Sequence, residues 1–335
     1  MFSNTADYIS EKYKQFDKPI GNEFTSNVSF SQFEMFTKCP KRWELKYVKK
    51  IGKFLPSIHL VFGTAMHQCV QKYVTDVLEG VIKDANEVDY APILASKMKS
   101  ELDELTKTWE KKEPNRDDYT FTSKTELRKF FLDGMEIINY IKRDKHRKKY
   151  FDKRTYDMVA VELPIKTKII DDYDVNILMF IDTVLFNKEN DTYTIIDYKT
   201  STKSWGKYQK EDKLKLSQAL IYKMFFSKVF DIELSKVESK FLVLKREVNQ
   251  DMFEGHTQVV NPSQGKPSLN KVTTLLEFMV KFAFNKDGSY KSNVTYPAIG
   301  GSSHKNCKFC EFRDTEHCPA TNRLTVVDDI RGLLK

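Results

Sequence analysis

Three consecutive strand-like segments in the middle of the chain constrain its fold more than any other feature. Residues 158–169 (MVAVELPIKTKI), 174–187 (DVNILMFIDTVLFN) and 192–200 (TYTIIDYKT) are rich in β-branched and apolar residues. Asn190 and Asp191 separate the last two segments, as a hairpin turn requires. Helical patterns precede and follow this meander. The order predicts an α/β sandwich with a mixed central sheet flanked by helices, rather than a doubly wound sheet with regular alternation.

The N-terminal third reads as helical. Residues 1–26 are polar and are expected to form a loose arm, and residues 28–50 predict two short helices. Ser31 with Glu34 has the spacing of a capping box, and Pro40 suits the first turn of the second helix. Gly63 precedes a helical pattern that places Met66, Val70, Tyr73 and Val77 on one face.

The remaining elements complete a single domain over residues 1–335. It is divided into N-terminal helices (28–69), a charged helical insertion (84–155), a central core (156–262) and a C-terminal helix with a cysteine cluster (263–335). Further strands are expected at 237–247 and 255–262, and helices at 213–230 and 269–284.

Composition limits the kind of protein. Hydrophobic residues make up 40% of the 335 residues, enough for a sizeable core, and the net charge of +8 favours an acidic partner such as nucleic acid. The apolar runs are short, such as ILMFI at 177, and the N-terminus lacks a secretory pattern, so we expect a soluble, cytoplasmic protein without membrane association. Five cysteines in a reducing compartment indicate packing, metal binding or catalysis.

Acidic residues at strand ends are the strongest chemical signal. Asp197 and Lys199 share one face of the strand TIIDYK, and Asp182 ends the neighbouring apolar strand. Glu162 lies in a third strand. Close carboxylates repel one another, and a hard cation such as Mg²⁺ relieves the repulsion. The alternatives are a surface salt pair for Asp197 with Lys199 and a solvent-facing edge for Glu162.

Two helices add polar residues to this set. Gln218 and Tyr222 are four apart and therefore share one helix face. His67 follows Gly63 by four on an earlier helix. A lone histidine is more often a core or surface residue than a ligand.

The motifs together resemble the RecB-like branch of the PD-(D/E)XK nuclease superfamily. GTAMH, VELP, FID, DYKT and QALIY occur in the family's order between residues 63 and 222. The resemblance implies a restriction-endonuclease-like core and a metal-dependent DNA exonuclease. One departure is Phe180, where many members have glycine.

The resemblance also assigns roles to the residues of these motifs. Asp182, Asp197 and His67 would bind Mg²⁺ or Mn²⁺, with Glu162 in support. Lys199 would orient or activate the attacking water, and Gln218 and Tyr222 would orient the lysine loop or the strand being cut.

Four cysteines form a second candidate site. Cys307, Cys310 and Cys318 have the spacing C-x₂-C-x₇-C, and Cys39 stands far away in TKCPKRW. Zinc is the default for such a set, with His304 and His317 as further candidate ligands, whereas Cys69 is expected to be packing. A subgroup of the same branch, including AddB and the CRISPR-associated RecB-like exonucleases, resembles this arrangement. That resemblance implies a [4Fe–4S] cluster on the four cysteines, which would join the N- and C-terminal regions.

Basic runs point to DNA as the partner. Residues 140–154 contain eight lysines and arginines with three aromatic residues, and residues 41–53 are similar. Such runs suit single-stranded DNA or free ends, although a solvated helix face is the simpler alternative. No Walker motif is found, so the chain would act alone or with a helicase or recombination partner.

The pathway stays open between DNA repair, recombination and phage or CRISPR-related DNA processing. In a phage, the expected location would be the host cytoplasm. The competing hypothesis is a non-catalytic DNA-binding or scaffold subunit that retains the fold.

Overall fold

The computed structural model of the chain describes residues 26–52, 56–80, 85, 87–112, 121–248 and 255–324. These residues cluster into two compact units. The first comprises the described residues of Phe54–Leu163 and Phe180–Ser263, and the second those of Lys18–Lys53, Pro164–Met179 and Gln264–Lys335. Almost all of the expected N-terminal arm, residues 1–26, lies outside the described residues.

A mixed sheet forms the centre of the first unit. Strand β3 pairs antiparallel with β4, β4 pairs parallel with β5, and β5 pairs antiparallel with β6. The strands with residues in this unit are β2 (Tyr156–Lys168), β3 (Val175–Asn187), β4 (Thr192–Ser201), β5 (Val237–Lys245) and β6 (Thr257–Val260), of which β2 and β3 contribute residues to both units. β4 is buried along most of its length because it lies between two strands with helices on both faces.

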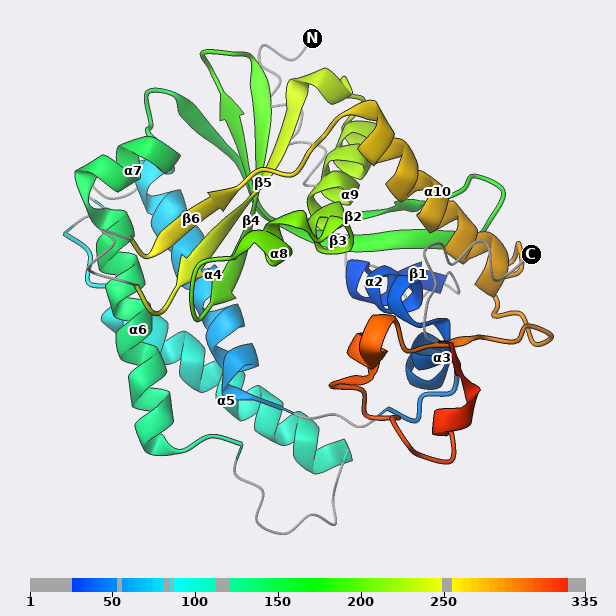
Figure 1. Ribbon diagram of the computed structural model, residues 1–335. Helices are drawn as coiled ribbons and strands as arrows, with labels where there is room; N and C mark the ends of the chain where they lie inside the picture. The colour runs from blue at the N-terminus through cyan, green and yellow to red at the C-terminus, as the bar shows by residue number, and fades with distance from the viewer. Residues whose placement is uncertain are drawn as a thin grey trace. The chain divides into compact units, whose positions relative to one another are not determined.

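Helices cover both faces of this sheet (Figure 1). On one face lies a core built from α4 to α7 against Leu185, Ile196, Tyr198, Leu242 and Leu244. On the other face, Phe241 and Val243 pack with Ala219 of α9. The helices of the unit are α4 (Ile58–Glu79), α5 (Ala91–Lys112), α6 (Lys124–Lys142), α7 (Asp144–Phe151), α8 (Lys207–Glu211) and α9 (Lys213–Phe230). The predicted α/β architecture with a mixed sheet flanked by helices is confirmed.

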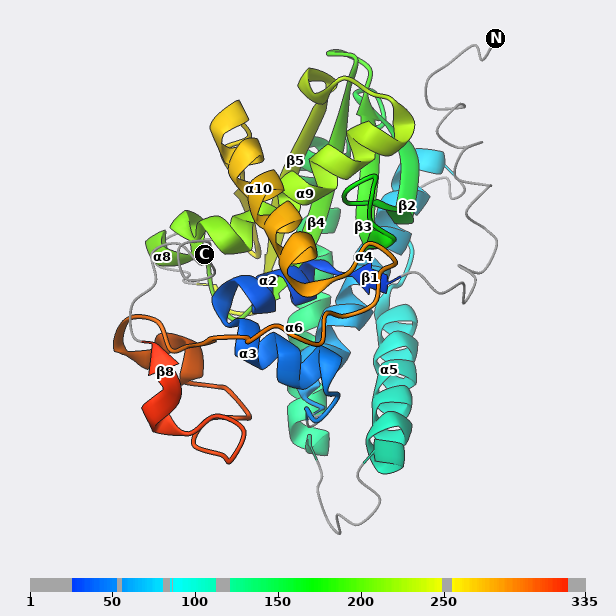
Figure 2. The same cartoon turned by 90° about the vertical axis from the view of Figure 1, so that its right-hand side faces the viewer.

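The second unit packs around aromatic side chains. Trp43 is fully buried, with the rings of Phe36, Phe284, Tyr290 and Tyr296 at 5.5–5.9 Å. Figure 2 shows α2 beside α10, whose Phe282 lies 5.9 Å from Phe36. Its main elements are β1 (Ser26–Val28), α2 (Phe30–Lys38), α3 (Pro40–Trp43), a π-helical turn (Glu44–Val48), α10 (Lys266–Ala283), β7 (Ala298–Ile299) and β8 (Arg323–Leu324).

Two local predictions in the N-terminal helices were wrong. Ser29, not Ser31, caps α2, because Ser29 has extended backbone angles and its hydroxyl accepts a hydrogen bond from Gln32 N at 3.3 Å. Gly63 lies inside α4 rather than before it. A glycine weakens a helix by only about 1 kcal/mol, which burial of the flanking Val61 and Phe62 offsets. Pro40 begins α3 as expected.

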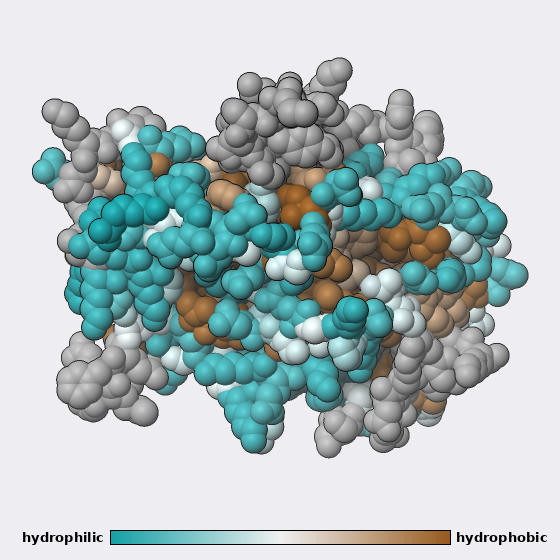
Figure 3. Space-filling view, turned by 90° about the horizontal axis from the view of Figure 1, so that it is seen from above, coloured by the Kyte–Doolittle hydropathy of each residue, from teal (hydrophilic) through white to brown (hydrophobic). Residues whose placement is uncertain are grey.

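The surface is mostly hydrophilic. In the view of Figure 3, charged and polar residues cover most of the coloured surface, and hydrophobic residues show in separate patches. Within the described ranges, no helix combines the length and the apolar character needed to cross a membrane.

Candidate functional site

The site begins where strands β3 and β4 part. Their ladder runs from Asn187 opposite Thr192 to Thr183 opposite Ile196, and stops there. The next pair in this register is Asp182 and Asp197. Instead of backbone pairing, the Asp182 Oδ2 atom accepts a hydrogen bond from Tyr198 N at 2.7 Å. The two acids therefore flank the opening between the strands, and both are buried.

Asp197 and Lys199 form the second half of this arrangement. Lys199 Nζ lies 2.8 Å from Asp197 Oδ2, but no donor in the described part of the chain meets that buried oxygen with hydrogen-bond geometry. Burial raises the pKa of Asp197 to about 6, with Lys199 opposing the rise and Asp182 adding to it. Two buried carboxyl groups therefore share this opening with one lysine, and burial disfavours the charged form of Asp197.

His67 reaches the same place from α4. Its Nδ1 lies 3.5 Å from Asp182 Oδ1, and its ring meets the Tyr198 ring edge-on at 5.9 Å. Burial by itself would lower the pKa of His67, but the Asp182 carboxylate raises it on balance. His67 is therefore not an isolated core or surface histidine, because it lies beside Asp182.

Glu162 joins the site through a residue that the sequence patterns did not single out. Gln71 Nε2 donates to Glu162 Oε1 at 2.6 Å and to the Asp182 carbonyl at 3.2 Å. Glu162 has a left-handed backbone (φ 49°) in the middle of β2, a strained conformation typical of functional sites. Gln71 follows His67 by four on α4, so the helix period was the signal that could have found it.

Gln218 and Tyr222 lie together on α9. Gln218 Nε2 donates to Tyr222 Oη at 2.8 Å, and Tyr222 is buried. Burial raises the pKa of Tyr222 well above its usual value, and the negative charges of Asp197 and Asp182 raise it further. The tyrosine therefore faces the acids as a neutral phenol.

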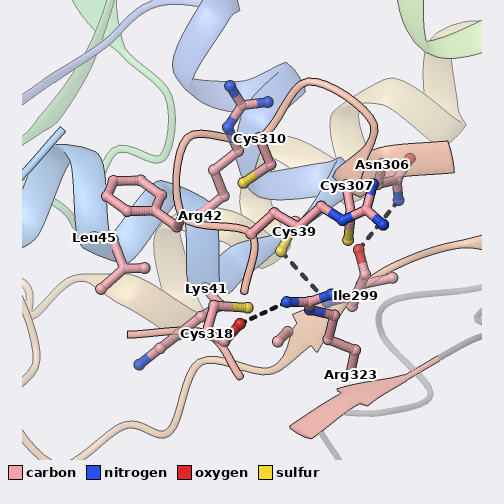
Figure 4. Close-up of a pocket in the computed structure, with 13 residues that line it drawn as sticks. Cys39, Lys41, Arg42, Leu45, Ile299, Asn306, Cys307, Cys310, Cys318 and Arg323 are labelled. Carbon is pink, nitrogen blue, oxygen red and sulfur yellow. Dashed lines mark hydrogen bonds between the residues drawn. The ribbon is translucent and has the colours of Figure 1, made fainter. Parts of the chain in front are cut away.

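The four cysteines of the second unit line one pocket. Cys39, Cys307, Cys310 and Cys318 surround it, and Figure 4 shows their sulfur atoms facing the same space. Cys39 Sγ accepts a hydrogen bond from Ile299 N at 3.3 Å. Burial raises the pKa of Cys39, and the neighbouring Cys310 and Cys318 raise it further.

The other residues considered as ligands lie outside the cysteine pocket. His304 and His317 are not among the residues that line this pocket. Cys69 lies on α4 and is fully buried in the apolar core, where burial raises its pKa to about 12. This position fits its expected packing role.

The two basic runs have different surroundings. Arg147, Lys148, Lys153 and Arg154 line a pocket of about 420 Å³ at the end of α4. In the other run, Lys41 and Lys49 both pair with Glu44, at 2.7 Å and 3.1 Å, and Arg42 pairs with Glu311 at 2.6 Å. Residues 41–49 therefore offer less uncompensated charge to a partner than the sequence suggests.

No ready-made metal centre is present in the described residues. No group of three or more histidine, cysteine, aspartate or glutamate side chains is arranged so that it could hold an ion as it stands. The paired acids and the four thiols are the places where such residues gather most closely.

The fold and the paired acids define a mixed α/β protein with an acid–acid–lysine site. The chain belongs to the PD-(D/E)XK nuclease superfamily, whose sequence profile matches residues 27–318. The protein is therefore a member of a nuclease family. No functionally curated protein matches the chain in sequence.

Two solved structures are similar over most of their length. One, named "Putative exonuclease", comes from Eubacterium rectale and has 13% identity, a TM-score of 0.43 and 83% coverage of each chain. The other, SSO0001, has 11% identity and a TM-score of 0.35, and covers 91% of this chain and 92% of its own. Both likenesses are too distant to inform function.

Proposed function

We propose that the protein is a divalent-metal-dependent deoxyribonuclease that degrades DNA from free ends. The observation that carries the proposal is the pair Asp182 and Asp197 at the parting of β3 and β4, with Lys199 Nζ 2.8 Å from Asp197. Membership of a nuclease family supports the reaction class. The restriction to DNA and to free DNA ends rests on the order of the five motifs and on the basic run at residues 140–154.

The residues fit a hard divalent cation. Asp197 Oδ2 is a buried oxygen whose close neighbour Lys199 Nζ, at 2.8 Å, does not meet it with hydrogen-bond geometry, and two neighbouring carboxylates raise each other's energy when both are charged. Oxygen-rich sites of this kind favour Mg²⁺ or Mn²⁺. Asp182 and Asp197 would hold the ion, with His67 beside Asp182 and Glu162 held in place by Gln71.

Each side chain has a distinct task in phosphodiester hydrolysis. An ion held by Asp182 and Asp197 would supply positive charge that acidifies a water molecule and stabilises the leaving oxygen. Lys199 orients the attacking water and offsets the charge that develops on the phosphate. The Tyr198 amide fixes Oδ2 of Asp182, so that Oδ1, 3.5 Å from His67 Nδ1, would be the oxygen that binds the ion.

Digestion of linear and circular DNA tests the proposal. Purified protein is incubated with linear single-stranded, linear double-stranded and closed circular DNA, with Mg²⁺, Mn²⁺ or a chelator. We expect degradation of linear DNA only, and none with the chelator. Cutting of circular DNA would show an endonuclease instead. Binding without cleavage in any metal would favour a scaffold subunit.

We also assign the chain to the RecB-like branch and infer a metal cluster on its cysteines. Five motifs in family order support the branch. Four thiols that share one pocket have the donor chemistry of a [4Fe–4S] cluster or of structural zinc. Cys39, Cys307, Cys310 and Cys318 would hold it. Iron, sulfide and zinc analysis of anaerobically purified protein distinguishes the two.

Gln71 is expected to position the site without touching the phosphate. Gln71→Ala removes the bridge between Glu162 and the Asp182 carbonyl, and loss of such supporting contacts typically costs about 10- to 100-fold in activity or metal affinity. Titration of cleavage rate against Mg²⁺ measures the effect.

Gln68→Ala serves as the matched control for Gln71. Gln68 lies on the same helix but bonds to Glu101 at 3.4 Å, away from the acids. The Gln68→Ala variant should have the same cleavage rate and the same Mg²⁺ requirement as wild type. An unaltered metal titration in Gln71→Ala, with normal thermal unfolding, would contradict the positioning role.

A further inference from the structure

An exposed tyrosine surrounded by lysines follows the Lys199 strand. Tyr208 of α8 is 92% exposed, the highest value among the large hydrophobic side chains that the structure describes. Residues 203–215 contain five lysines and only two acids, Glu211 and Asp212. Asp212 is engaged as the cap of α9, where its Oδ1 accepts from Leu214 N and Lys215 N. This stretch is therefore a basic surface with one aromatic ring displayed on it.

The surface is held rigidly although it lies outside the sheet. Arg246 N and Glu247 N donate to the carbonyls of Ser201 and Thr202 at 3.0 Å and 2.8 Å. Trp205 N donates to Gln258 Oε1 at 2.8 Å, and the Trp205 ring is buried. Gly206, the N-cap residue of α8, follows this anchor directly. A fixed base of this kind presents the Tyr208 ring with little ordering cost on binding.

The anchor connects this surface to the acids and the lysine of the site. Phe241 is the register partner of Asp197, and its ring centroid lies 5.8 Å from Lys199 Nζ. The Trp205 ring lies a further 5.5 Å from the Phe241 ring. Tyr208 is three residues beyond Trp205, in the first turn of α8. The contacts from Lys199 through Phe241 to Trp205 therefore connect the site to the segment that carries Tyr208.

The lysines near Tyr208 indicate which kind of molecule would bind this surface. Among the residues that the structure describes, the ammonium groups of Lys207, Lys210 and Lys213 form no ion pair. Three lysines without ion pairs, within five residues of an exposed ring, fit a polyanion that carries flat aromatic groups. Single-stranded nucleic acid has both features, because its phosphates attract lysine and its unpaired bases stack on aromatic side chains.

We propose that Tyr208 is a base-stacking platform that guides single-stranded DNA to the site, with Lys207, Lys210 and Lys213 contacting the phosphates. This inference rests on the proposed DNA-cleaving function and adds to it a preference for unpaired strands. The bases of a duplex are stacked on one another and would not offer a free face to the Tyr208 ring.

Binding of a fluorescent oligothymidylate tests the platform without catalysis. Affinities are measured with a chelator present, so that no DNA is cut. Tyr208→Ala should weaken binding by about 5- to 150-fold, the range for loss of one stacked base, whereas Tyr208→Phe keeps the ring and should bind like wild type. Leu132→Ala removes another exposed apolar side chain of the same unit and should have no effect. Blunt duplex binding should be unchanged in all three variants.

The lysines are tested through salt dependence. Replacing Lys207, Lys210 and Lys213 together by alanine should lower the slope of log affinity against log salt by about 2, since each phosphate contact on a single strand contributes about 0.7. The same triple change at Lys97, Lys99 and Lys107 of α5 is the control and should leave the slope unchanged.

Several results would overturn the proposal. Equal oligothymidylate affinity for wild type and Tyr208→Ala would show that Tyr208 does not stack on a base. Equal losses in Tyr208→Phe and Tyr208→Ala assign the effect to the hydroxyl rather than to stacking. Absence of any binding by wild type also refutes it. Because none of these measurements needs cleavage, a negative digestion assay and a negative Tyr208 result are distinguishable.

Discussion

Replacement of Lys199 by methionine is expected to abolish metal-dependent DNA cleavage, with a loss of at least about 100- to 1000-fold. The change keeps the length of the side chain but removes the ammonium group that lies 2.8 Å from Asp197 Oδ2. Removing one group that stabilises developing charge has costs of this size in other enzymes. Asp197→Asn should have a similar effect, because it removes a charge from the pair that would hold the ion. Initial rates on linear DNA at saturating metal measure both.

Lys240→Met provides the control for Lys199→Met. Lys240 lies on β5 opposite Ile196, on the face of the sheet turned away from Asp197 and Lys199. The Lys240→Met variant should cleave linear DNA at a rate close to that of wild type. DNA binding in the chelated protein should survive in all variants, because the basic surface is untouched. Near-normal cleavage by Lys199→Met would rule out the assigned role of this lysine.

The central strands could be predicted because their residues alternate and end in turn signals. The apolar runs before Asp182 and Asp197, separated by Asn190 and Asp191, indicate a hairpin with one acid on each strand. The hairpin register then makes the two acids the next opposing pair. Side-chain period and a short turn are local properties, so one sequence is enough to reveal them.

The supporting contacts of the site could not be predicted, because they depend on packing between distant segments. Gln71 meets Glu162 across 91 positions of the chain, and the left-handed backbone of Glu162 has no signature in VELP. The proposed role of Tyr208 also has no signature in the sequence. KYQKE reads as an ordinary solvated helix, and only the anchoring of Trp205 beside Phe241 relates it to Lys199.

Helix ends were mispredicted where two residues could serve the same purpose. Ser29 and Ser31 are both good caps, and the choice depends on which backbone is extended in the folded chain. The domain boundaries stay a prediction. Contacts divide the described residues at Leu163 and Met179, inside β2 and β3, and no compositional break marks either position.

Loss of one cysteine ligand is expected to have the second large effect. Cys39→Ser should remove the bound metal and lower the melting temperature by about 10 °C or more, since a structural metal site contributes roughly 10 kcal/mol or more to small domains that depend on it. Cys39 is the N-cap residue just before α3, whereas Cys307, Cys310 and Cys318 lie in the chain after α10. Metal on all four would tie two segments more than 260 residues apart. Differential scanning calorimetry with metal analysis measures both quantities.

Cys69→Ala is the matched control for Cys39→Ser, because Cys69 is fully buried among apolar side chains in the other unit. It should cost a modest amount of stability through a small cavity and leave the metal content unchanged. About four irons with sulfide in wild type would identify a [4Fe–4S] cluster, and about one zinc a structural zinc site. Wild-type protein that contains neither iron nor zinc would refute both the cluster and the zinc site. A Cys39→Ser variant that keeps the metal content of wild type would refute them as well. Because the four thiols belong to the second unit and Asp182, Asp197 and Lys199 to the first, the metal loss should act on stability before it acts on the chemistry of cleavage.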